Sequence, residues 1–265
     1  MKIPEVSITR KCLYGVLALV AGMPSLLWAQ GNAAQANAGA QASARPQANF
    51  ITVRILHYVP SEQANMEAAL ADLAKARGAA GEPFFHVYQS ARGPGGYMIV
   101  QVDRQFGNSN LPPVQNPPAV VSRLQKSEAE APRVITLRMY PEISTGGGSA
   151  TAAPPGEFMR VRVTTTSPGN NDAAFALQRD QLVPAYKKAG GNRRTGRVAA
   201  GGNVNEFVEF SYMKQLGRAD WNLAESMGQK DFDQMVGRLR ALNTSEHIFW
   251  YRFRPDLSFS SAPQR

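Results

Sequence analysis

The side chains with the clearest chemical potential in this sequence are arginines that recur at matching places along the chain. Arg54 and Arg162 lie in similar alternating runs of apolar and polar residues, and Arg138 and Arg252 lie in similar runs further along. A guanidinium group offers a planar fork of donors that can bind a carboxylate with two parallel hydrogen bonds. If folding brings these four arginines together, we expect them to bind a small anionic molecule.

Residue types that usually hold metals or form nucleophilic sites are scarce. The 265 residues include one cysteine, Cys12, and three histidines, His57, His86 and His247, which share no common spacing. One cysteine excludes a disulfide framework and a multi-cysteine metal site, and no Ser/His/Asp set can be assembled. We therefore predict no metal and no cofactor, and the catalytic residues, if there are any, stay unknown.

The arginines recur because the chain contains an internal repeat. Residues 50–54 match 158–162 at a spacing of 108 residues, and residues 138–144 match 252–258 at a spacing of 114. Several further blocks between them match in the same order, which favours a duplication. The sequence therefore divides into a first repeat at 50–144 and a second at 157–258. A Gly/Pro/Ala linker at 145–156 joins the two repeats, and a flexible tail is predicted at 259–265.

The segment before the first repeat is typical of a targeting signal followed by a spacer. Residues 1–29 combine basic residues, an apolar run and a small residue at the expected cut site, which is typical of a cleaved signal peptide. An uncleaved anchor is the alternative, although the run is shorter than the roughly 20 apolar residues that span a bilayer. Residues 30–49 are rich in Ala, Gln, Asn and Gly, so we predict a disordered spacer. We expect a periplasmic or secreted protein that has no stable membrane span after cleavage.

Each repeat shows the same order of strand, helix, strand, strand, helix and strand. In the first repeat the strands are predicted at 51–58, 84–90, 97–102 and 134–140, with helices beginning at Ser61 and Pro118. In the second repeat the strands are predicted at 159–166, 195–200, 206–212 and 248–253, with helices at 172–189 and 230–242. Pro184 should distort the first of these helices, because proline lacks a backbone donor.

This βαββαβ order is the split βαβ, or ferredoxin-like, unit. Two such units in tandem resemble the dimeric α+β barrel superfamily, with both halves on one chain. That superfamily includes antibiotic-biosynthesis-type monooxygenases, stress-responsive barrels, chlorite dismutase-like proteins and haem-degrading enzymes. The resemblance implies an α+β fold in which the two repeats pair as an intramolecular barrel, and hence a monomer. It rests on topology and the repeat, not on a diagnostic motif, so it implies architecture more than activity.

Strand alternation places the candidate site within this fold. We predict that Val53 and Val161 face the helices and that the four arginines face the partner sheet, where first and fourth strands would bring Arg54 beside Arg138 and Arg162 beside Arg252. The same face would carry the other candidate ligand-binding residues, which are Glu209, Trp250, His86 and Tyr88, although Phe85 and Val87 could replace the last two.

Several charged groups have a plainer alternative explanation. The arginines could pair with Glu209, Glu206 and backbone carbonyls, or reach solvent at the barrel mouth. A further basic cluster around Lys187, Lys188 and residues 193–197 is expected to be a solvated helix end.

Three functions fit these observations. The first is an exported protein that binds a small anionic or aromatic ligand in the inter-sheet cavity without catalysis. The second is a cofactor-free monooxygenase-like enzyme of the barrel class. The third is a module that binds an envelope surface, since the formal charge of +9 falls only to +7 without the leader and the excess lies mostly in the second repeat. We predict no nucleic-acid partner, because export separates the protein from chromosomal DNA and cytoplasmic RNA.

Overall fold

The computed structural model describes residues 49–93, 95–103, 115–145, 156–217, 219 and 221–261. The predicted signal peptide, nearly all of the predicted spacer and most of the predicted linker lie outside these residues. Among the helices of the described part of the chain, none combines the length and apolar character needed to cross a bilayer.

The first repeat contains the predicted elements, with boundaries shifted by one or two residues. Its strands and helices are β1 (Asn49–His57), η1 (Pro60–Glu62), α1 (Gln63–Ala79), β2 (Phe84–Ser90), β3 (Gly96–Val102), α2 (Pro118–Ser127), β4 (Arg133–Met139) and η2 (Pro141–Ile143).

The second repeat follows the same order with additions. Its elements are β5 (Phe158–Thr166), α3 (Asn171–Leu177), the π turn η3 (Gln178–Leu182), α4 (Val183–Lys188), β6 (Asn192–Ala200), β7 (Glu206–Met213), α5 (Leu223–Met227), α6 (Gln229–Leu242), β8 (Asn243–Phe253), η4 (Pro255–Leu257) and β9 (Phe259–Ser260). The π turn ends two residues before Pro184, so the predicted distortion of this helix is confirmed.

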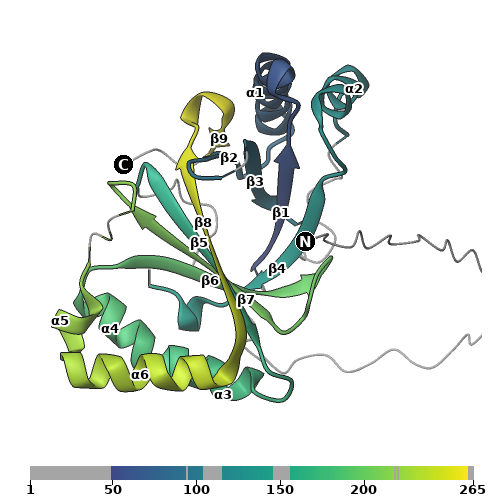
Figure 1. The fold of residues 1–265 in the computed structure, drawn as a ribbon. Helices are drawn as coiled ribbons and strands as arrows, with labels where there is room; N and C mark the ends of the chain where they lie inside the picture. The colour runs from purple at the N-terminus through teal and green to yellow at the C-terminus, as the bar shows by residue number, and fades with distance from the viewer. Residues whose placement is uncertain are drawn as a thin grey trace, which may run out of the picture. The chain divides into compact units, whose positions relative to one another are not determined.

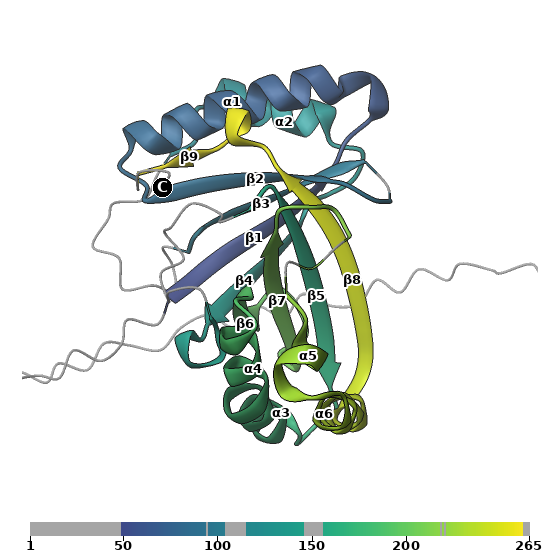
Figure 2. The ribbon, with the colours of Figure 1, turned by 90° about the vertical axis from the view of Figure 1, so that its left-hand side faces the viewer.

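The strands join one antiparallel sheet that closes on itself. Their order is β3-β1-β4-β6-β7-β5-β8-β2-β9, and β3 also pairs with β2, which closes a barrel of eight strands with β9 added at β2. The repeats meet where β4 pairs with β6 and where β8 pairs with β2. Helices α1 and α2 lie on one side of the strands, and α3, α4 and α6 lie on the other (Figures 1 and 2). The predicted α+β barrel of two ferredoxin-like repeats is confirmed.

The strand faces that carry Val53, Val161 and the four arginines are the reverse of the prediction. Val53 and Val161 lie inside the barrel, in an apolar cluster to which all eight of its strands contribute. Arg54, predicted to face the partner sheet, lies instead on the same face as Leu56, which packs in the layer beneath α1 and α2. Alternation shows which residues share a face, but both faces of these strands carry apolar side chains, so it could not show which face is inside.

The C-terminal residues of the second repeat form contacts with the first repeat. The prediction of a flexible tail is wrong for Phe259 and Ser260, which form β9 against Phe84 and Phe85 of β2. Just upstream, Arg254 bonds Glu67 of α1 through two nitrogen–oxygen contacts of 2.9 and 3.1 Å, and these bonds lower the pKa of Glu67 to about 2.

A close backbone contact at the junction of β4 and β6 gives a stability prediction. Gly201 has φ of +75°, and a Cβ there would lie 2.2 Å from the carbonyl oxygen of Val134. Gly201→Ala should therefore lose about 1–2 kcal/mol to backbone strain and a further 1–3 kcal/mol or so by forcing the strands apart.

The matched control is Gly81→Ala. Gly81 has φ of +71°, but no atom lies within 4 Å of the position that a Cβ would take there, so only the backbone strain applies. Urea denaturation of both variants measures the difference, and equal losses would show that the junction tolerates a side chain.

Candidate functional site

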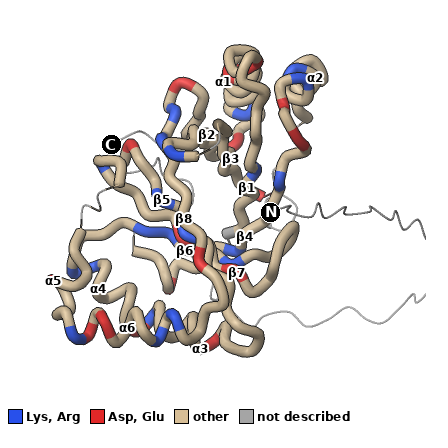
Figure 3. Tube along the Cα trace, viewed as in Figure 1, with Lys and Arg blue, Asp and Glu red and all other residues tan. Residues whose placement is uncertain are grey.

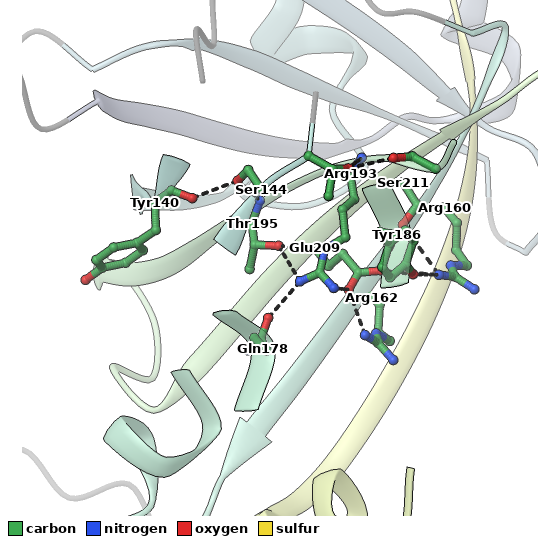
Figure 4. Close-up of polar contacts among 12 residues, drawn as sticks. Tyr140, Ser144, Arg160, Arg162, Gln178, Tyr186, Arg193, Thr195, Glu209 and Ser211 are labelled. Carbon is green, nitrogen blue, oxygen red and sulfur yellow. Dashed lines mark hydrogen bonds and ion pairs between the residues drawn. The ribbon is translucent and has the colours of Figure 1, made fainter. Parts of the chain in front are cut away.

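A cluster of charged side chains surrounds Glu209 on the helix side of the second repeat (Figure 4). Arg162 Nη2 lies 2.7 Å from Glu209 Oε2, and Arg193 Nη1 lies 3.2 Å from the same oxygen. Arg160 Nη2 lies 3.2 Å from Oε1. We call Arg160, Arg162, Arg193 and Glu209 the arginine cluster.

Strand register explains why these four side chains meet. Glu209 of β7 lies directly opposite Arg162 of β5 and opposite Thr195 of β6. Arg160 and Arg193 both lie opposite Ser211, two residues further along β7 and therefore on the same face. The Ser211 hydroxyl donates to Glu209 Oε1 at 2.8 Å. Figure 3 shows blue (Lys, Arg) and red (Asp, Glu) segments next to each other near the labels of β6 and β7.

The helices hold the buried arginine of the cluster in place. Arg193 Nη2 donates to Gln178 Oε1 at 2.7 Å and to the Thr195 hydroxyl at 2.8 Å. Its guanidinium lies 4.8 Å from the centre of the Tyr186 ring. Gln178 begins the π turn, and its carbonyl accepts the backbone N–H of Val183. Turns of this kind occur frequently at functional sites.

The arginine cluster carries more positive than negative charge in a buried place. Arg193 is 0 % exposed and Glu209 is 3 % exposed, while three guanidinium groups share the one carboxylate. Burial alone would raise the pKa of Glu209, but the charges of Arg162, Arg193 and Arg160 outweigh it and hold that pKa well below its usual range. Buried charge of this kind is costly unless it is compensated.

A pocket of about 170 Å³ adjoins the cluster, between the sheet and the helices of the second repeat. Arg162, Glu209, Gln178 and Thr195 form its polar floor. The other residues that line it are Thr164, Ala174, Phe207, Val236, Leu239, Arg240, Asn243 and Glu246.

One guanidinium nitrogen of Arg162 faces a carboxylate that is too far away for a hydrogen bond. Its Nη1 lies 3.9 Å from Glu246 Oε1, beyond hydrogen-bond distance, and the Glu246 side chain is 44 % exposed. The coulombic attraction of Glu209 raises the pKa of Arg162, so this group stays charged. Arg162 Nη1 is therefore a charged donor at the pocket, and the anionic group of a ligand could bind to it.

The first repeat has a different composition at the corresponding positions. Ile99 lies opposite Arg54, where Glu209 lies opposite Arg162, and Thr52 stands in place of Arg160. Arg54, the counterpart of Arg162, bonds Glu128 at 3.0 Å. The layer under α1 and α2 is packed with apolar side chains. The charged cluster is therefore a feature of the second repeat.

Only two of the eight predicted site residues meet in the cluster, namely Arg162 and Glu209. The prediction that Arg54 lies beside Arg138 is wrong, because Arg138 is opposite Phe50, four residues along β1 and so about 13 Å away. The same four-residue offset separates Arg162 from Arg252. The strands are neighbours as predicted, but their register could not be read from the sequence.

The other predicted residues are dispersed. Arg138 is exposed and lies over the Tyr140 ring, Arg252 pairs with Glu157 at the surface at 2.8 Å, and Trp250 stacks under Arg92. His86 and Tyr88 point into the barrel, which settles the phase of the second strand.

Sequence reasoning missed Arg193 as a buried residue. The basic stretch from Lys187 to Arg197 was expected to be a solvated helix end, and this is wrong for Arg193 and Arg194, which are 0 % and 8 % exposed. Their position on a strand explains this burial, because β6 begins at Asn192, three residues before the predicted start. Along a strand that begins there, alternation directs the Arg193 side chain towards the helices and the Arg194 side chain into the barrel.

The pocket does not fit a haem, the cofactor of some proteins with the fold that the sequence resembles. A haem iron needs an axial His, Cys, Met or Tyr ligand, and the described residues that line the pocket include none of these. Its volume is also below the roughly 300 Å³ at which sites for drug-sized ligands begin. Within the described part of the chain, His, Cys, Asp and Glu side chains form no group of three that could hold a metal ion.

Comparison with known proteins identifies the fold. The chain matches a proposed monooxygenase from Fusobacterium nucleatum with a TM-score of 0.60 and 12 % identity, over 78 % of this chain and 93 % of that one. It matches a proposed monooxygenase from Lactobacillus acidophilus with a TM-score of 0.55 and 12 % identity, over 81 % and 97 %.

A third similar structure, an anthrone oxidase-like protein, gives a TM-score of 0.52 at 11 % identity over 82 % and 98 %. No protein-family model matches the chain. No curated protein matches it by sequence. At these identities the comparisons establish the shared fold alone.

Proposed function

We propose that this dimeric α+β barrel binds a small organic anion, without catalysis, in the pocket between the sheet and the helices of its second repeat. One observation carries the proposal: three arginines share a single buried glutamate at the floor of a pocket. We place the organic ligand there and not in the expected inter-sheet cavity, because the barrel interior is packed mostly with apolar side chains and contains a cavity of only about 20 Å³.

The walls indicate how such a ligand would lie. Its carboxylate would accept from Arg162 Nη1 in place of the distant Glu246 and would offset the excess charge of the cluster. Its apolar part would pack on Phe207, Val236 and Leu239, which line the same pocket. Arg240, also at the pocket, is exposed and supplies a second cation.

The monooxygenase alternative has less support from this geometry. An uncharged aromatic substrate would leave the excess charge of the cluster uncompensated, whereas an anion would neutralise part of it. The names of the similar structures favour that alternative only through a shared fold. We further propose that the protein is exported, on the strength of its first 29 residues.

Benzoate and benzamide test the proposal, because they share a ring and differ in charge. Benzoate should raise the melting temperature of the full chain in a saturable way, and benzamide should do so far less. Arg162→Met should weaken benzoate binding by about 10- to 100-fold, the usual range for one charge-assisted hydrogen bond.

The matched control is Arg252→Met, since Arg252 also pairs with a glutamate but lies at the surface. This variant should bind benzoate as the parent does. Equal binding by the two variants, or equal binding of benzoate and benzamide, would contradict the proposal. Oxygen uptake with a hydroquinone would support the enzyme instead.

A further inference from the structure

The interior of the barrel contains a second, separate cavity. Its volume is about 20 Å³, enough for one species of about the size of water. Apolar residues Ile51, Val100, Met139 and Phe210 form part of its wall. The rest is polar and consists of His86, Tyr88, Arg194 and Tyr212. Polar groups of this kind are unexpected in a barrel that is otherwise apolar.

His86 is the observation that points to a ligand. The residue is 3 % exposed, and its Nε2 is buried without a hydrogen-bond partner. A buried polar atom without a partner costs about 1–3 kcal/mol, so such atoms usually have one. Because His86 lines the cavity, a bound species there would supply the missing partner.

The chemistry of the wall favours an anion. Arg194 contributes a permanent positive charge, its guanidinium lying 5.5 Å from the centre of the Tyr212 ring. The described residues that line the cavity include no Asp or Glu. Tyr88 is hydrogen-bonded to Tyr212, which leaves the Tyr212 hydroxyl and the imidazole N–H of His86 as groups that can donate to a bound anion. The charge of Arg194 repels a cation and attracts an anion.

We propose that this cavity binds one halide-sized inorganic anion, held by Arg194, His86 and the hydroxyl of Tyr212. The site differs from the pocket of the arginine cluster, since its residues point into the barrel and not towards the helices. It lies where strands of both repeats meet, because its residues come from β1, β2, β3 and β4 and from β6 and β7. The bound anion would therefore join the two halves of the barrel.

The low pKa of His86 is consistent with this site. Burial and the charge of Arg194 lower it to about 3, so the imidazole is neutral near pH 7. Arg194 is then the charged group among those that line the cavity, since burial also raises the pKa of Tyr88 and so keeps its hydroxyl protonated.

Crystals of the full chain grown in bromide test the proposal directly. We expect one anomalous bromine peak inside the barrel, between His86 and Arg194. A water there, or a bromine peak found only at the protein surface, would overturn the proposal. This measurement needs no variant and does not depend on the pocket of the second repeat.

Melting temperature in solution gives an independent test. Replacing gluconate by chloride at constant ionic strength should raise the melting temperature along a saturable curve. Tyr212→Phe removes one donor and should shift the chloride midpoint to a higher concentration by about tenfold or more. Arg194→Met should abolish the effect, and if that variant does not fold, Tyr212→Phe still tests the site.

Arg138→Met is the matched control, because Arg138 is exposed outside the barrel and should leave the chloride curve unchanged. A parent protein insensitive to chloride, or a response unaltered in Tyr212→Phe, would count against the anion. Failure of benzoate to bind would not bear on this test.

Discussion

Glu209→Gln should lower the free energy of unfolding by about 3–5 kcal/mol, the cost of removing one partner from a buried ion pair. Glutamine keeps the shape and one acceptor oxygen of the side chain but removes its charge. Arg193, which is 0 % exposed, would then lie near Arg160 and Arg162 with no carboxylate between them. Chemical denaturation at pH 7 measures the loss.

Two further variants make this result interpretable. Glu246→Gln removes a carboxylate that is 44 % exposed and 3.9 Å from Arg162, and should cost less than about 1 kcal/mol. Adding Arg193→Met to Glu209→Gln removes one uncompensated cation and should recover part of the loss. The double variant could instead have a lower free energy of unfolding than Glu209→Gln, by as much as the deletion of a second buried group costs. In that case repulsion between uncompensated charges would not explain the loss in Glu209→Gln.

The fold was accessible from the sequence because a repeat and periodicity determine it together. Matching blocks in the two halves, such as residues 50–54 and 158–162, gave one order of elements twice. The boundaries that were missed belong to segments with weak patterns. Strand β8 begins at Asn243, five residues before the predicted start, in a polar stretch where alternation is hard to see.

The candidate site was accessible only in part, because it depends on register and on sidedness. Alternation correctly grouped Arg162 and Glu209 on one face, yet that face lies against helices and not inside the barrel. Register then decides which neighbours meet, and a shift of four residues separates Arg54 from Arg138. Arg193 was missed because the start of its strand was placed too late.

The repeats have diverged in how they compensate the same inherited arginine. Arg54 has its own glutamate, Glu128, at 3.0 Å, and the layer around it is apolar. Arg162 shares Glu209 with two other arginines beside a pocket. Duplication explains this pattern if the first repeat kept a structural role while the second gained a binding site.

Lowering the pH from 6.5 to 4.5 should cost the protein about 2 kcal/mol of unfolding free energy through His86 alone. The pKa of His86 is lowered from 6.5 to about 3, so the unfolded chain binds a proton that the folded chain excludes. The contribution of His86 to the free energy of unfolding is fully present above about pH 6.5 and is lost as the pH drops towards 3. The limiting slope of this contribution against pH is about 1.4 kcal/mol per pH unit. The pKa of Glu67 is lowered from 4.5 to about 2, so the stabilisation that this carboxylate provides is lost mainly below pH 4.5.

His86→Gln removes the titrating group and should flatten the curve in this window, while His247→Gln, on an exposed part of β8, should retain the slope of the parent. An unchanged slope in His86→Gln would show that His86 takes up its proton in the folded state. The experiment also bears on the barrel cavity: an anion bound beside His86 favours the imidazolium, so the slope of the parent should be smaller in chloride than in gluconate. His86→Gln should show no such difference between the two salts.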